Sequence, residues 1–308
     1  MLKFIVRRIF WTIPVLLVVI FLTFIMMRQI GGNPFRQTER AVPEAVQRNL
    51  ERKFHVSDPW YVQYGYYVKG VATLDLGPSL VVRGREVNDI VKEHFPNSVE
   101  LGIYAFLFAI IVGIPLGIVA ALKHNTPIDY AAMFFSNVFH AVPSFLVATL
   151  MIYYLSLKAG ALPTSGWSSW EHKILPSIAL GFAPMALFAR LVRGTMLETL
   201  QQDYVRTARA KGLRYRRVVG LHVLRNSLIP VITAAGPLLG FIITGSFVIE
   251  LIFNIPGIGQ YYVTAVNARD YSVVMGLTVL LSVIVIFANL IVDILYGILD
   301  PRTRDARA

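Results

Sequence analysis

The chain contains no cysteine, which excludes disulfide bonds and thiolate metal sites. Its histidines are far apart in the sequence and form no HxxxH or HExxH pattern, so the sequence gives no sign of a metal centre. It also lacks a GxxxxGKS/T phosphate-binding loop, and we do not expect it to hydrolyse ATP unaided. Charged residues are scarce as well, at 15% of the 308 residues.

Apolar residues dominate what is present. They make up 56% of the chain, and a chain of this size cannot surround such long apolar runs with a soluble core. We therefore predict a polytopic membrane protein. The formal net charge of +11 does not indicate nucleic-acid binding, because the basic residues sit in short segments between apolar runs.

Six apolar runs are candidates for membrane spans. The first covers residues 9–27, is too long for the apolar part of a signal peptide, and ends in Met26-Met27-Arg28 rather than at a small-residue cleavage site. The other five exceed the roughly 20 residues needed to cross about 30 Å of hydrocarbon. They cover residues 99–122, 130–157, 174–197, 228–252 and 272–299. The sequence thus predicts an all-α fold with six transmembrane helices.

The basic residues of the short loops predict the orientation of these spans. They gather after the second span, around the fourth-to-fifth connection and at the C-terminus, whereas the opposite short loops hold only Lys158, Lys173 and Arg269. By the positive-inside rule, both termini and the fourth-to-fifth connection are expected in the cytoplasm.

A long polar segment over residues 31–96 is expected outside the cytoplasm. Short helices are predicted from Pro43 to about Phe54 and over residues 88–93. An aromatic cluster between them favours interfacial anchoring and a small loop core over docking of an external partner. Its members are Trp60, Tyr61, Tyr64, Tyr66 and Tyr67.

Glycine and proline interrupt four of the spans. Glycine allows close helix approach and proline kinks a helix or frees a carbonyl, which favours helices that line a solute path. Both are also generally more frequent in membrane helices, so a packing role stays open. The residues are Gly113, Pro115, Gly117, Pro143, Gly181, Pro184, Gly236, Pro237, Gly240 and Gly245.

Two ionisable residues lie near the ends of spans. Glu250 precedes a Pro-Gly-containing turn over residues 253–259, so it either folds that turn or faces the path. Asp293 has Asn289 and Tyr296 about one helical turn away, which favours a structural role. The candidates for polar packing or path lining are Tyr104, Ser144, Thr244 and Ser246.

The chemistry of an enzyme is only weakly suggested. His140 and Ser144 stand one helical turn apart, as in an intramembrane hydrolase, but Pro143 disturbs that turn. No GxSxG-like elbow accompanies the pair. The sequence therefore favours a protein that is not an enzyme.

The longest polar interruption in the second half of the chain, residues 201–231, predicts a helix–turn–helix. Asp203 can cap a first helix that runs to about Lys211, and Gly212 is suited to leave it in a left-handed conformation. The second helix is predicted from Tyr215 to Leu224, with an apolar face and an opposite basic face. On the first arm, Ala208 and Ala210 are expected to be exposed.

These residues resemble a known motif. The run from Tyr204 to Leu213, followed by His222-Val223-Leu224-Arg225-Asn226 and Ile229-Pro230, is similar to the cytoplasmic loop motif of ABC importer permeases. Its form is that of the dipeptide, oligopeptide and nickel branch. The opening MLKFIVRRIFWTIPVLL and the segments 74–80, 256–260, 269–274 and 292–302 also resemble the first oligopeptide permease subunit.

The resemblance implies a type I ABC importer permease fold and a division into three parts. Residues 1–30 would form the cytoplasmic N-terminus and first span, 31–96 an extracytoplasmic loop region, and 97–308 a permease core with the coupling loop 200–230. The residues implied in ATPase coupling are Asp203, Tyr204, Arg206, Thr207, Ala208, Arg209, Ala210, Lys211, Gly212, Leu213, Arg216 and Arg217.

The same resemblance implies a set of partners. The chain would pair with a second homologous permease in the bacterial inner membrane, rest on two cytoplasmic ABC ATPases that bind ATP and magnesium, and receive peptides from an extracytoplasmic binding protein. No cofactor is expected on this chain itself. The small residues of the motif would let its backbone enter a cleft of the ATPase, and its basic residues would orient the encounter.

Alternatives remain within and outside this family. A dipeptide or nickel permease of the same branch fits the motifs nearly as well. A secondary transporter or channel would show buried charge pairs at mid-membrane and inverted repeats, and neither is clear in the sequence. A membrane scaffold would not need the shaped cytoplasmic hairpin.

Overall fold

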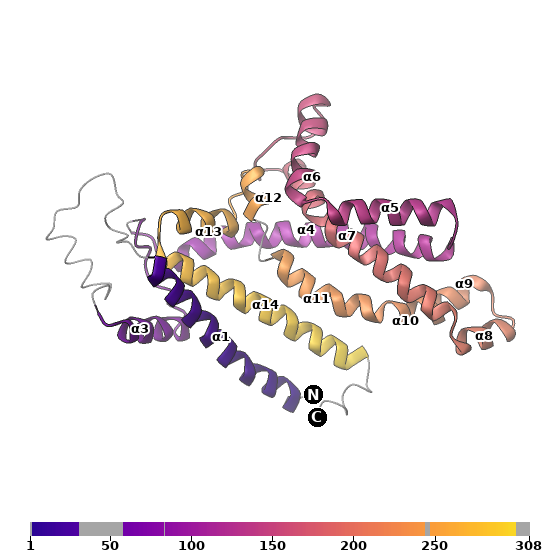
Figure 1. Ribbon diagram of the computed structural model, residues 1–308, viewed down its shortest axis with the longest axis horizontal. Helices are drawn as coiled ribbons and strands as arrows, with labels where there is room; N and C mark the ends of the chain where they lie inside the picture. The colour runs from indigo at the N-terminus through magenta and orange to yellow at the C-terminus, as the bar shows by residue number, and fades with distance from the viewer. Residues whose placement is uncertain (1, 31–57, 83, 244–246, 300–308) are drawn as a thin grey trace. The chain divides into compact units, whose positions relative to one another are not determined.

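The computed structural model describes residues 2–30, 58–82, 84–243 and 247–299, with the helix backbone alone for residues 2–6, 8, 9, 30 and 292–299. The chain forms two compact units. Among the described residues, one comprises 99–243, 247–255 and 287–299, and the other comprises 2–30, 58–82, 84–98 and 256–286. Both are helical in their described parts (Figure 1).

The helices follow one another in a simple order. The chain begins with α1 (Leu2–Ile30), α3 (Trp60–Ala72), α4 (Val87–Leu122), α5 (Pro127–Ala141), α6 (Ser144–Met151) and the π-helix η2 (Ile152–Lys158). There follow α7 (Trp170–Leu200), α8 (Asp203–Ala210), α9 (Tyr215–Val218), the π-helix η3 (Val219–Leu224) and α10 (Arg225–Ser227). The last are α11 (Ile229–Ile243), α12 (Phe247–Ile252), α13 (Ile258–Asn267) and α14 (Tyr271–Leu299).

Within the described residues, four helices are long and apolar enough to cross a membrane, and counting two bent helix pairs as spans raises the number to six. The four are Phe10–Gln29, Val87–Leu122, Trp170–Leu200 and Tyr271–Ile291. They confirm the first, second, fourth and sixth predicted spans. The bent pairs are Pro127–Ala141 with Ser144–Lys158, and Tyr215–Ser227 with Ile229–Ile243.

The third predicted span is not one continuous helix. A bend of 103° separates Pro127–Ala141 from Ser144–Lys158. Val142 takes an extended conformation with φ −78° and ψ 126°, because the ring of Pro143 disfavours a helical conformation in the residue before it. The predicted span over residues 130–157 is therefore broken at Pro143, the residue that the sequence marks as its interruption.

The fifth predicted span differs from the structure at its beginning. Helices α11 and α12 cover residues 229–243 and 247–252, and residues 244–246 lie outside the described part. Before α11, the bent pair places Tyr215–Ser227 at 45° to it. The helical path therefore extends back into the segment predicted to be a cytoplasmic loop.

Three of the interrupting glycines pack helices closely. A Cβ atom at Gly113 or Gly117 of α4 would lie 2.5 Å from the carbonyl oxygen of Met185 or Ala189 on α7. One at Gly181 of α7 would lie 2.7 Å from the carbonyl oxygen of Ala105 on α4. Because each obstacle is backbone, these glycines let α4 and α7 approach to a distance that no other residue allows. The packing role that the sequence left open is therefore confirmed for these three glycines.

The aromatic cluster packs against the first span in the second unit. The ring of Phe21 on α1 lies edge-on to those of Trp60 and Tyr64, at centroid distances of 6.4 and 5.6 Å. The Tyr64 hydroxyl donates to the Leu17 carbonyl over 3.2 Å. This agrees with the predicted loop core. The predicted helix over residues 43–54 lies outside the described residues, and the one over residues 88–93 is the beginning of α4.

A buried carboxylate joins two loops of the second unit. Asp270, just before α14, accepts hydrogen bonds from the Ser79 hydroxyl and from the backbone N–H groups of Leu80 and Val81, at 3.1 and 3.3 Å for the latter two. The carboxylate is 2% exposed. The segments 74–80 and 269–274 therefore each supply part of one hydrogen-bonded network.

Candidate functional site

Helix α8 has the local structure that the sequence predicts, except at its beginning. It runs from Asp203 to Ala210, and Gly212 follows in the left-handed region with φ +79°. The residue before the helix is Gln202, and no side chain caps it. Asp203 instead occupies the first turn, with its carboxylate 3.6 Å from Arg206. The prediction of Asp203 as the cap was therefore wrong by one position.

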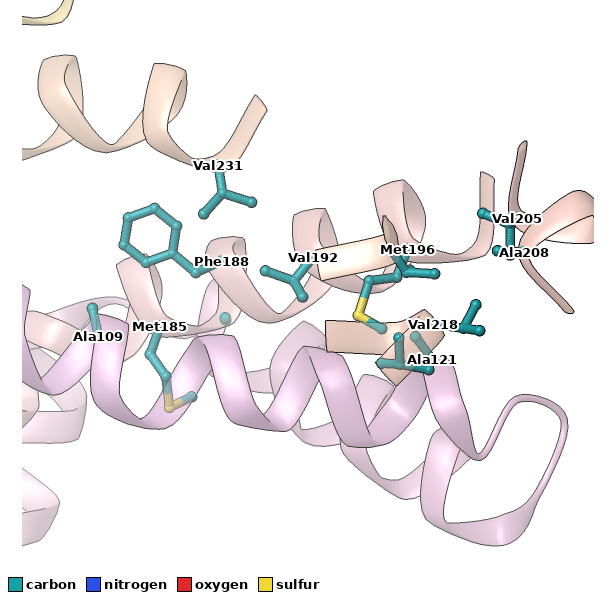
Figure 2. Close-up of a cluster of buried hydrophobic side chains, with 13 residues drawn as sticks. Ala109, Ala121, Met185, Phe188, Val192, Met196, Val205, Ala208, Val218 and Val231 are labelled. Carbon is teal, nitrogen blue, oxygen red and sulfur yellow. The ribbon is translucent and has the colours of Figure 1, made fainter. Parts of the chain in front are cut away.

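One face of α8 is buried against its own chain. Val205 is fully buried and Ala208 is 6% exposed. They share one face at a spacing of three residues and join a cluster with Met196 of α7 and Val218 of α9. Figure 2 shows Val205 and Ala208 beside Val218, beyond the end of the row that Phe188, Val192 and Met196 form.

The burial of Ala208 corrects the prediction that it is exposed. Its small side chain allows close packing of α8 against this cluster, rather than against a partner. Val205 was not predicted as a site residue, and it belongs to the same buried cluster as Ala208. Of the two alanines, only Ala210 is exposed.

The apolar seam of the second arm is confirmed in part. Val218, Val219 and Val223 are buried, whereas Tyr215 is 53% exposed. The arm begins as α9 and continues as the π-helix η3 from Val219. Such segments are rare and are frequent at functional sites.

Polar contacts fix the hairpin further. The Asn226 amide donates to the Tyr204 hydroxyl over 2.9 Å, and the Arg209 guanidinium lies 5.7 Å from the centroid of the Tyr215 ring. The Thr195 hydroxyl of α7 donates to the Ser227 carbonyl over 2.8 Å. These contacts tie both arms to each other and the second arm to α7.

The remaining predicted coupling residues form an exposed surface, which we call the basic tip. Leu213, which was also predicted as a coupling residue, is partly buried and is not part of this surface. The exposed residues are Asp203, Tyr204, Arg206, Thr207, Arg209, Ala210, Lys211, Gly212, Arg216 and Arg217. Five of these ten residues are basic and one is acidic, so the surface favours a partner with acidic groups.

A buried ion pair lies on the helix that leads to α8. Arg193 of α7 donates to both carboxylate oxygens of Asp129 on α5, from Nε over 2.6 Å and from an Nη over 2.8 Å. The Asp129 carboxylate is fully buried and also accepts from the Asn125 N–H over 3.0 Å. His124 Nδ1 lies 3.2 Å from the same carboxylate. This pair was not predicted from the sequence, and it clamps the start of α5 to α7.

Three of the five candidate path residues, Tyr104, Ser144 and Glu250, lie in the described part of the chain. Tyr104 is 39% exposed and donates to Glu100 over 3.0 Å. Ser144 is partly buried at the first position of α6. Glu250 is fully buried in α12, and its carbonyl accepts from the Ile255 N–H over 2.8 Å, which favours its role in the turn. Thr244 and Ser246 lie outside the described residues.

The structure separates the Ser/His pair that suggested an intramembrane hydrolase. His140 and Ser144 belong to separate helices on either side of the 103° bend, so they do not share the helical turn that would align them. Across residues 2–30, 58–82, 84–243 and 247–299, no group of three or more potential metal ligands is found. The side chains of Asp293 and Tyr296 lie outside the described residues.

The long apolar helices define a helical membrane protein, and the basic hairpin is an exposed polar segment of it. Family comparison gives the class a name. Residues 113–305 match the model of the binding-protein-dependent transport system inner membrane component, and residues 1–102 match its N-terminal companion. The chain belongs to this family of transport permeases.

Curated relatives cover the whole chain. It is 46% identical over 305 residues to the dipeptide transport system permease protein DppB of Bacillus subtilis (strain 168), covering 99% of this chain and 98% of the relative. It is 45% identical over 306 residues to the oligopeptide transport system permease protein OppB of Salmonella typhimurium, covering 99% and 100%. These relatives are permease subunits of transport systems, and the fold is that of an ABC importer permease.

Solved structures agree on the fold. A chain of the inward-facing MetNI methionine ABC transporter matches with a TM-score of 0.56 at 17% identity, covering 68% of this chain and 96% of that one. A second crystal form of the same transporter gives a TM-score of 0.54 at 16% identity. At such identities the likeness concerns the fold alone.

Proposed function

We propose that this chain is the permease subunit of an ATP-driven, binding-protein-dependent peptide importer, and that the basic tip is where it docks on its ATPase. The observation that carries the proposal is the division of α8 into two faces. Val205 and Ala208 seat the helix on the permease, while Ala210 and Gly212 stay exposed. A helix that transmits movement needs rigid packing against its own chain and a face that a partner protein can reach.

Peptide as the cargo is supported by the relatives. One of them is named a dipeptide permease and the other an oligopeptide permease, at nearly equal identity. Their shared cargo class is therefore the proposal for this chain. Selection by peptide length is assigned to the external binding protein, which meets the peptide first.

The assembly follows from the proposed coupling. Two related permeases form the path, and each places its tip on one of two ATPase subunits that hold ATP and magnesium. The chain spans the inner membrane of a bacterium. The basic tip and both termini lie on its cytoplasmic side. Nucleotide and the loaded binding protein each favour one packing of the spans, because a ligand shifts a conformational equilibrium only by binding one state better.

A single cysteine tests the docking directly. Since the chain has no cysteine, Ala210→Cys provides its single thiol, which is loaded with a photoactivatable maleimide before the ATPase is added to form the complex. We expect cross-linking to the ATPase subunit, because Ala210 is exposed beside the left-handed turn at Gly212.

The matched control is Thr73→Cys, an exposed position after α3. It is expected to give no ATPase adduct and to react with a membrane-impermeant maleimide from outside the cell. Reaction of Ala210→Cys from outside, or cross-linking of both positions to the ATPase, would contradict the proposed docking and orientation.

A further inference from the structure

A lysine side chain sits in a cage of one carboxylate and two aromatic rings in the first unit. Lys173 Nζ, near the start of α7, lies 2.5 Å from Glu100 Oε1 on α4. It lies 5.8 Å from the centroid of the Tyr104 ring and 5.4 Å from that of the Trp167 ring. A carboxylate combined with aromatic faces is the usual environment in which proteins bind an ammonium group.

The cage is organised independently of the lysine. The Tyr104 hydroxyl donates to Glu100 Oε1 over 3.0 Å, and the Trp167 indole N–H donates to Glu100 Oε2 over 3.1 Å. These two donors orient the carboxylate and would remain if the lysine moved away. Trp167 also packs against the apolar cluster that contains Leu101 and Leu175, so one wall of the cage has a buried support.

The cage is open on one side. The side chain of Glu100 is 33% exposed, that of Lys173 is 23% exposed, and Tyr104 is 39% exposed. Partly exposed ion pairs of this kind contribute only about 0–1 kcal/mol to stability. Fastening α4 to α7 is therefore a weak reason for three donors to converge on one carboxylate, since the glycine contacts already pack these helices closely.

We propose that Glu100, Tyr104 and Trp167 form a binding site for a primary ammonium group, and that Lys173 is its tethered occupant, which the N-terminal ammonium of a peptide displaces. The inference rests on the proposed function for the identity of that ligand. A free amino terminus is the one cation that peptides of every sequence share. The site would thus recognise peptides without reading their side chains.

Displacement is chemically reasonable because lysine is a flexible side chain with a compact charge. A tethered competitor acts at an effective concentration in the millimolar range. The exchange replaces one ammonium by another, so the Glu100 charge is never left unpaired.

The test measures binding of trialanine and of N-acetyl-trialanine to the full chain in nanodiscs, by the fluorescence of Trp167. Lys173→Met removes the occupant and keeps most of the apolar stem. It is expected to bind trialanine about tenfold more tightly than the parent chain does, because the competitor is gone. N-acetyl-trialanine, which has no ammonium, should bind neither chain measurably.

Two further variants make the result specific. Adding Glu100→Gln to Lys173→Met should abolish the preference for the free amino terminus, and Trp167→Phe should remove the fluorescence change and thereby assign it to this cage. Equal binding of the two peptides by Lys173→Met, or binding of neither, would overturn the proposed site. Failure of the proposed transport function would show differently, as an absence of ATP-driven peptide uptake by the unmutated complex.

Discussion

Replacing Gly212 with valine is expected to abolish coupled transport while leaving the chain inserted and folded. Gly212 has φ +79°, a conformation that costs an L-residue about 1–2 kcal/mol and suits a β-branched residue least. A Cβ atom there would meet nothing within 4 Å of the chain itself. The substitution therefore strains only the turn of the basic tip.

The measurement is peptide uptake and ATP hydrolysis by the complex in proteoliposomes. For Gly212→Val we expect uptake to fall at least about tenfold, the equivalent of about 1.4 kcal/mol in coupling, while hydrolysis continues without uptake. Gly212→Asn is the matched variant, because asparagine tolerates the left-handed conformation. If conformation is what matters, Asn should retain more uptake than Val.

A second control separates docking from general damage to glycines. Gly194 lies on α7, where an added Cβ also meets nothing within 4 Å. Gly194→Ala should leave both uptake and hydrolysis near their original values, because alanine is the best helix former. Normal uptake by Gly212→Val would count against α8 as the coupling helix.

Loss of Arg193 is expected to destabilise the chain more than any change at the exposed tip. Arg193→Met would leave the fully buried Asp129 carboxylate with the Asn125 N–H and His124 as its remaining partners. Removing one partner of a buried pair typically costs about 3–5 kcal/mol, because the remaining charge stays in a poor solvent. Thermal unfolding in detergent micelles measures the loss.

The double variant Asp129→Leu with Arg193→Met tests whether the loss of stability in Arg193→Met comes from the unpaired Asp129 charge or from the change in side-chain volume. Since replacing both charges by apolar groups removes the uncompensated charge, the double variant should unfold at a higher temperature than Arg193→Met alone. An unfolding temperature of Arg193→Met equal to that of the unmutated chain would show that the clamp between α5 and α7 contributes nothing.

Local signals in the sequence predicted the local structure well. The apolar runs gave the long helices because span length follows from the thickness of a bilayer. Gly212 identified the end of α8 because few residues adopt a positive φ readily. Pro143 marked an interruption, yet the size of the bend, 103°, depends on how α5 and α6 each pack against α7 and could not be read from the residue alone.

Contacts between distant segments were not predictable in the same way. Asp129 and Arg193 are 64 positions apart, and Glu100 and Lys173 are 73 apart, with no periodic pattern to connect them. Ala208 and Ala210 look alike in the sequence, but only tertiary packing decides that the first is buried. Tyr104 was selected as a candidate path residue, whereas its partners Glu100 and Trp167 became visible only in the structure.

The central claim, that this chain couples ATP hydrolysis in a partner to peptide entry, is tested most directly by uptake into proteoliposomes. The purified complex is reconstituted with ATP at the side of the basic tip and radiolabelled trialanine with the binding protein at the other side. The account predicts accumulation of peptide against its gradient that requires both ATP and the binding protein. Equilibration of peptide that is independent of ATP would contradict it and indicate a channel or a secondary transporter.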